Sequence, residues 1–137
     1  MDRLKERLEI ARKALVSFRE ALRETATPMN RDASIQRFEY TYEAVWKAAQ
    51  LYLRNRENLE LASPSSVIRA CFQAAVLNEE QGRMALDMAR DRNLTVHTYN
   101  EELANQIYSR LAAYAGLMEH WLAAMREGAG SNDESRR

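Results

Sequence analysis

Apolar residues recur every three or four positions along most of the chain, which is the spacing of one face of an α-helix. Three long stretches carry this pattern, over residues 2–24, 32–53 and 101–126, and two shorter ones lie between them, over residues 64–75 and 79–89. No stretch alternates between apolar and polar residues for long enough to predict a strand. The pattern therefore predicts an all-α protein, an up-and-down bundle of four or five helices.

The residues between these stretches are of the kinds that begin or end helices. Pro28 interrupts the apolar spacing after the first stretch, because proline cannot continue a helix. Side chains that can accept a hydrogen bond from the first helical turn precede the later stretches: Ser63, Asn78 and Asn100. We expect residues 1–126 to form one bundle. Residues 127–137 are glycine, serine, asparagine and charged residues for the most part, and are expected to form a disordered C-terminal tail.

Charge and cysteine content narrow the classes of function. The 137 residues include 20 Lys plus Arg and 20 Asp plus Glu, so the formal net charge is zero. This balance argues against a protein that covers DNA or RNA through a large basic field, and we expect no DNA partner. The single cysteine, Cys71, excludes an internal disulfide and suits the cytoplasm. No apolar run is long enough for a membrane span, so we expect no membrane partner.

The segment from Asp91 to Asn100 is the candidate functional region. It connects two predicted helices and contains Arg92, Asn93, His97 and Tyr99 within eight residues. Loops held between rigid helices often carry function. Taken alone, Arg92 could be only a cation at a helix C-terminus, where the helix dipole favours positive charge, and His97 only a loop histidine.

The spacing Arg92-x4-His97-x-Tyr99, with polar Asn93 directly after the arginine, resembles the Arg-polar-x-x-x-His motif of HEPN domains. The likeness covers roughly residues 1–125. Three stretches in it are similar to the HEPN branch called nucleotidyltransferase substrate-binding proteins: residues 36–47, 63–69 and 91–102.

The resemblance implies a helical bundle that forms a homodimer and acts with a minimal nucleotidyltransferase (MNT). In the MNT/HEPN toxin–antitoxin pairs, the HepT-like toxin is a metal-independent endoribonuclease. Carried over to this chain, Arg92 and His97 are the catalytic residues, Asn93 supports them, and RNA is the substrate. Tyr99 is the residue that the antitoxin AMPylates to silence the toxin. The alternative is a non-catalytic subunit that presents substrate to the nucleotidyltransferase.

The chemistry of RNA cleavage without a metal fits these residue types. A base must take the 2′-OH proton and an acid must protonate the leaving 5′-oxygen, and histidine can do either near neutral pH. Arginine can bind phosphate oxygens in bidentate fashion. One Arg92–His97 pair supplies only half of the acid–base groups, and a two-fold dimer would supply the second histidine.

Other candidates have simpler explanations. His120 is the only other histidine, so a histidine metal site is not expected, nor is a cofactor. Glu39 and Glu43 lie one helical turn apart but lack the Glu-x-x-His partners of metal-binding bundles, and we interpret them as surface or packing residues. Cys71 lies on an apolar stripe and is interpreted as a core residue. A third option is a helical adaptor in which Arg92 and His97 affect only stability.

Overall fold

The structure is a computed structural model that describes the backbone of residues 2–135 and the side chains of residues 3–130. The described residues contain no strand. They form one 3₁₀ turn, η1 (Thr95–His97), and five α-helices: α1 (Asp2–Arg23), α2 (Pro28–Glu57), α3 (Pro64–Gln73), α4 (Glu79–Leu94) and α5 (Glu101–Ser135). The all-α bundle predicted from the apolar spacing is confirmed.

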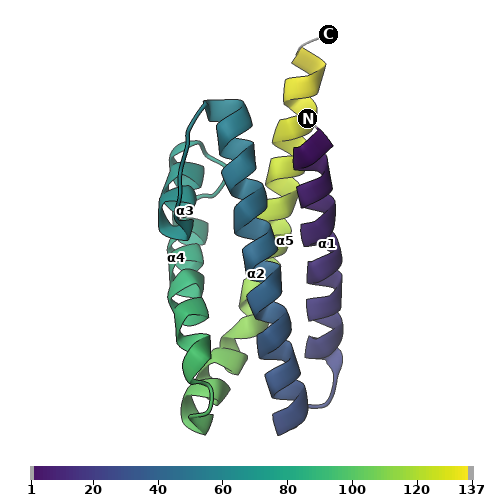
Figure 1. The fold of residues 1–137 in the computed structure, drawn as a ribbon, viewed down its shortest axis with the longest axis vertical. Coiled ribbons are helices and arrows are strands. Elements are labelled where there is room, and N and C mark those ends of the chain that lie inside the picture. Colours follow the sequence, from purple (N-terminus) through teal and green to yellow (C-terminus); the bar gives the residue numbers. More distant parts are fainter. Residues whose placement is uncertain (1, 136–137) are drawn as a thin grey trace.

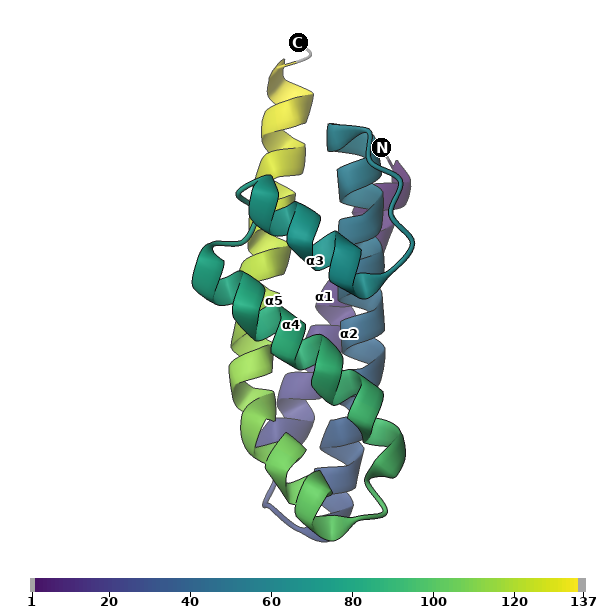
Figure 2. The ribbon, with the colours of Figure 1, turned by 90° about the vertical axis from the view of Figure 1, so that its left-hand side faces the viewer.

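The helices alternate in direction. In Figure 1, α1 and α4 run downwards while α2 and α5 run upwards, so the α1–α2 loop and the η1–α5 turn share one end of the bundle. Turned by 90°, Figure 2 shows α3 and α4 crossing obliquely in front of α2 and α5. Helix α1 packs on α2 and α5, whereas α4 packs on α3 and α5. The arrangement is an up-and-down four-helix bundle with α3 added to one face. No helix among the described residues is long and apolar enough to cross a membrane.

The helices begin at side chains that cap them. The predicted N-caps all accept a hydrogen bond from the first turn: Ser63 from Ser66 N, Asn78 from Gln81 N and Asn100 from Leu103 N. Gln81 returns the contact, because its side-chain oxygen accepts from Asn78 N at 2.9 Å and completes a capping box. These bonds satisfy backbone donors that the helix itself leaves without partners.

An aromatic cluster joins the three long helices. The Phe38 ring on α2 lies with its centroid 6.0 Å from that of Phe18 on α1 and 5.7 Å from that of Tyr114 on α5. Tyr42, one turn after Phe38, has its centroid 6.1 Å away. All four residues are at most 2% exposed. The cluster therefore fixes the side of α2 that faces the core.

Helix α4 is longer than predicted. It continues to Leu94 and η1 follows directly, so Arg92 and Asn93 lie on the last helical turn. The predicted loop is thereby reduced to η1 and residues 98–100. Leu94 is half-buried and packs against the core, which explains why the helix does not stop near Ala89 as expected.

Helix α5 continues past residue 126 to Ser135, into the segment 127–137 that was expected to form a tail, and residues 136–137 lie outside the described residues. At Gly128 it approaches α2 so closely that an added Cβ would collide with the Tyr52 hydroxyl. The Gly128 carbonyl accepts a hydrogen bond of 2.7 Å from Arg56 Nη1. The glycine that suggested a tail thus permits a close helix–helix contact.

Candidate functional site

The guanidinium of Arg92 lies between the last turn of α4 and the middle of α2. Its Nη1 is 3.1 Å from Glu39 Oε2, and its Nε is 3.8 Å from Glu43 Oε1. The Arg92 side chain is 26% exposed, so the pairs are partly shielded from water. Glu39 and Glu43 are one turn apart on α2, and both point to the same side because of that spacing. The sequence alone indicates surface or packing residues at these two positions and does not identify Arg92 as their partner.

Thr95, the first residue of η1, completes this polar contact. Its Oγ1 accepts a hydrogen bond of 3.0 Å from Arg92 Nη1 and lies 2.9 Å from Glu39 Oε2. The hydroxyl is also 2.8 Å from the carbonyl oxygen of Arg92, so its single proton has two acceptors within reach. Thr95 is buried. These contacts fix the direction of the backbone where it leaves the C-terminus of α4.

His97 and Tyr99 lie together on the solvent side of the same turn. Tyr99 Oη is 3.3 Å from His97 Nδ1, and the two rings meet edge to face with centroids 5.9 Å apart. Tyr99 is 83% exposed although it is a large aromatic residue. His97 is exposed as well, so both side chains are accessible to a ligand or a modifying enzyme.

The predicted site residues therefore divide into two groups. Arg92 faces the α2 carboxylates, whereas His97 faces Tyr99 and solvent. Within the part of the chain that the structure describes, no hydrogen bond joins Arg92 to His97, and the Asn93 side chain is exposed and makes none. The structure brings His97 and Tyr99 into contact but does not place Arg92 or Asn93 against them.

A buried polar triad fixes the residue before Arg92. Asp91, 3% exposed, accepts hydrogen bonds from Arg110 Nε at 2.7 Å, from Arg110 Nη2 at 2.9 Å and from the Tyr114 hydroxyl at 2.6 Å. Burial, with the hydrogen bond to Asp91, raises the pKa of Tyr114, which stays protonated as a donor. The triad anchors the end of α4 to α5 and so sets the angle at which Arg92 points to α2.

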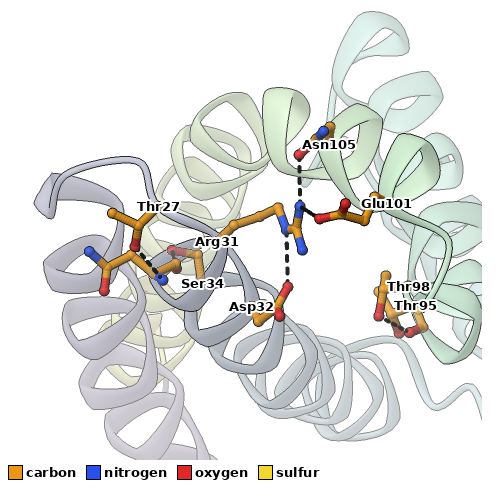
Figure 3. Close-up of polar contacts among 9 residues, drawn as sticks. Thr27, Arg31, Asp32, Ser34, Thr95, Thr98, Glu101 and Asn105 are labelled. Atoms are coloured by element: carbon orange, nitrogen blue, oxygen red, sulfur yellow. Dashed lines mark hydrogen bonds and ion pairs between the residues drawn. The ribbon is translucent and has the colours of Figure 1, made fainter.

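A buried arginine holds the start of α5. Arg31, 7% exposed, donates from Nε to Asp32 at 3.0 Å and from Nη1 to Glu101 at 3.3 Å and Asn105 at 3.0 Å. Figure 3 shows its guanidinium between α2 and the first turn of α5, joined by dashed lines to Asp32, Glu101 and Asn105. Arg31 therefore connects the first turn of α2 to the first turns of α5. Since Thr95 is bound at the other end, the segment from η1 to Glu101 is fixed at both ends.

The other metal-ligating or nucleophilic side chains that the structure describes do not form a second candidate site. No group of three metal-ligating side chains occurs among the residues that the structure describes. Cys71 is fully buried, and burial raises the pKa of its thiol to about 11, so the unreactive thiol form dominates at neutral pH. His120 is exposed on α5. The interpretation of Cys71 as a core residue is confirmed.

Comparison with known proteins places most of the chain in one family. Residues 6–127 match the family described as nucleotidyltransferase substrate binding protein like. The structure is similar to the crystal structure of a protein from Thermus thermophilus, with a TM-score of 0.82 and 53% sequence identity, covering 85% of this chain and 98% of that one. No curated protein matches the sequence.

Proposed function

The chain belongs to the nucleotidyltransferase substrate binding protein-like family, and from this premise we propose that it is the HEPN-type partner of a minimal nucleotidyltransferase. In this proposal it is a homodimeric, metal-independent endoribonuclease toxin, silenced by AMPylation of Tyr99. The observation that carries the proposal is the contact of 3.3 Å between the Tyr99 hydroxyl and His97 Nδ1. A group attached to that hydroxyl would lie directly against the histidine.

AMPylation at Tyr99 would act on His97 in two ways. The phosphodiester would replace the tyrosine hydroxyl proton, so the hydroxyl could no longer donate to Nδ1. It would also bring one negative charge next to the ring, and an anionic RNA phosphate would be repelled at the same place. The 83% exposure of Tyr99 leaves its hydroxyl accessible to a transferase without unfolding of the turn.

His97 is suited to proton transfer because it is exposed and its side chain makes one hydrogen bond among the described residues, with Tyr99. One histidine can serve as base or acid, and cleavage of RNA without a metal needs both in the same step. We therefore propose that the second histidine comes from the second copy of the chain in a two-fold dimer. Val96, directly before His97, is 66% exposed and would lie at such an interface.

Arg92 has a different role in this proposal from the one implied by the motif alone. Its guanidinium already pairs with Glu39 and approaches Glu43, so an RNA phosphate would have to compete with two carboxylates for it. We propose that Arg92 primarily positions the turn that carries His97, and contacts phosphate only when the carboxylates are displaced.

The experiment that tests the function is RNA cleavage by the purified chain in the presence of a chelator. At concentrations where light scattering finds a dimer, the unmodified protein is expected to cleave single-stranded RNA and leave 2′,3′-cyclic phosphate ends. Mass spectrometry must first establish that Tyr99 carries no AMP. A dimeric, unmodified protein that leaves RNA intact would refute the ribonuclease proposal.

The role of Tyr99 is tested with the nucleotidyltransferase partner and ATP. The wild-type chain is expected to gain the mass of one AMP group and to lose its ribonuclease activity. Tyr99→Phe removes only the acceptor oxygen, so it should gain no mass and remain active in the same mixture. Tyr40, which is 43% exposed on α2, provides the control, because Tyr40→Phe should still be modified. AMP on a residue other than Tyr99 would contradict the assignment.

The second candidate is a non-catalytic subunit that presents substrate to the nucleotidyltransferase. It is favoured by the same carboxylate contacts, since Arg92 in an ion pair is what a purely structural residue would show. In that case RNA would stay intact while the transferase would modify a third molecule only when this chain is present. The two candidates therefore differ in whether RNA is cleaved, and in whether the transferase modifies this chain or a third molecule.

A further inference from the structure

The two most exposed large apolar or aromatic side chains among the described residues lie at the same end of the bundle. Met29, in the first turn of α2, and Tyr99 are each 83% exposed. In Figure 1 the α1–α2 loop and the η1–α5 turn meet at this end. Val96, which is 66% exposed, lies there as well. Single exposed apolar residues are ordinary, but several in one region mark an interaction surface.

Hydrogen bonds hold the parts of this end together. Arg31, two residues after Met29, donates to Glu101 at 3.3 Å. Glu101 follows Tyr99 by two residues, so the backbone that carries Met29 is tied to the backbone that carries Tyr99. The hydroxyl of Thr27 caps α2 and fixes the loop before it. A partner therefore meets a preformed surface, and binding has to order fewer residues than it would in a flexible loop.

Carboxylates outnumber cations at this end. Residues 20–37 and 95–106 contain five carboxylates against three arginines. All five acidic residues are exposed: Glu20, Glu24, Asp32, Glu101 and Glu102. The cation between α2 and α5, Arg31, is buried and already engaged by two of them. Charge complementarity therefore favours a partner with a positively charged surface.

A small pocket lies at the same end, between the last turns of α1 and the start of α2. It has a volume of about 220 Å³, and its lining includes Glu20 and Glu24 of α1 and Asn30 of α2. Arg37 also lines it, but its Nη1 donates to the carbonyl oxygen of Ser17 at 2.8 Å. Neither glutamate makes an ion pair with another described side chain. The pocket is thus suited to a lysine or arginine side chain of a partner, which would pair with these carboxylates.

We propose that Met29, Tyr99 and the pocket of Glu20 and Glu24 together form the surface on which the nucleotidyltransferase docks, with a basic side chain of the transferase in the pocket. This inference rests on the proposed function, in which the transferase modifies Tyr99. To reach that hydroxyl, the transferase has to cover the η1–α5 turn. A stable interface buries about 800 Å² on each partner, so the contact extends from the turn to the adjoining start of α2.

Other occupants fit this surface less well. An RNA strand would bring its phosphates against Glu20, Glu24 and Asp32, which would repel them. A second copy of the chain, packed on the α1–α2 side, would place one excess of carboxylates against another. A transferase that takes AMP from ATP binds the triphosphate with cations, so the surroundings of its active site are expected to be positive and to complement this end of the bundle.

The first test is calorimetric titration of the full chain with the purified nucleotidyltransferase in the absence of ATP. Met29→Asp is expected to weaken binding by about tenfold or more, because it places a charge at the apolar part of the contact. Aspartate is favourable in the first turn of a helix, so α2 should remain intact. Ile10→Asp is the matched control: Ile10 is 60% exposed on α1, outside the surface, and this variant should bind as the wild type does. Thermal melting verifies that both variants are folded.

The pocket is tested by removing its charge. Glu20→Gln with Glu24→Gln is expected to weaken binding by about fivefold or more at low salt, and to make the affinity less dependent on salt. Glu57→Gln with Glu60→Gln is the control, because both residues are exposed at the end of α2 and just after it, and the net charge changes equally. Equal affinities of the two double variants would overturn the assignment of the pocket.

The docking surface and the proposed function can fail separately. Tyr99→Phe keeps the aromatic ring, so it is expected to bind the transferase as the wild type does although it cannot accept AMP. If Tyr99 of the wild type is AMPylated while Met29→Asp binds the transferase with unchanged affinity, the docking surface is wrong and the proposed function stands. If Met29→Asp loses binding while no AMP is transferred to the wild type, the surface stands and the modification is refuted.

Discussion

Replacing His97 by alanine is expected to lower the rate of RNA cleavage by about 100-fold or more while leaving the fold intact. The loss is that of one general acid–base group in a reaction that needs two. His97 is exposed and its side chain makes a hydrogen bond only with Tyr99 among the described residues, so its removal leaves no buried polar group without a partner. The measurement is the cleavage rate in chelator under single-turnover conditions, with thermal melting of the same preparation.

The matched control for this prediction is His120→Ala. His120 is the other histidine of the chain and is also exposed, on α5, so any contaminating nuclease or general effect of losing an imidazole would appear in both variants. Cleavage should fall in His97→Ala only. If His97→Ala cleaves RNA as fast as the wild type, the activity does not belong to this histidine, whatever the behaviour of Arg92→Ala. His97 is the sharper test, because Arg92→Ala also removes the α4–α2 ion pair.

The helical bundle could be predicted from the sequence because the residues that define each helix and its ends lie close together along the chain. Apolar residues at helical spacing, Pro28 after the first stretch and the side chain of Asn78 before the fourth helix each act within one or two turns. The element order and directions follow from these positions and short connections. The ends of α4 and α5 could not be predicted in the same way, because Leu94 and Gly128 are held by contacts with residues far away in the sequence.

The site was predictable only in part for the same reason. The motif spacing placed His97 and Tyr99 within two residues of each other, and the structure brings them into contact. The partners of Arg92 are Glu39 and Glu43, about fifty residues earlier, and their identity depends on how α4 crosses α2. Their spacing of four residues was the available clue. It indicates one helix face, but not which cation that face meets.

Asp91 anchors the end of α4, which carries Arg92, to α5. Replacing Asp91 by alanine is expected to lower the free energy of unfolding by about 3 kcal/mol. The substitution removes both hydrogen bonds from Arg110 and leaves the Tyr114 hydroxyl, buried in the core, without its acceptor. The Arg110 side chain is 43% exposed and can turn to water, so the loss is smaller than for a fully buried pair. Urea denaturation at neutral pH measures it as a lower midpoint at unchanged slope.

Asp87→Ala provides the control, because Asp87 lies one turn earlier on α4 and pairs with Arg90 while both side chains are more than half exposed. An exposed pair of this kind contributes at most about 0.5 kcal/mol, so its midpoint should barely move. Equal effects of the two substitutions would mean that helix propensity, and not the buried triad, sets the stability of α4. If the triad does fix α4, Asp91→Ala should also lower any activity of His97, because Arg92 and Thr95 follow directly on the turn that Asp91 anchors.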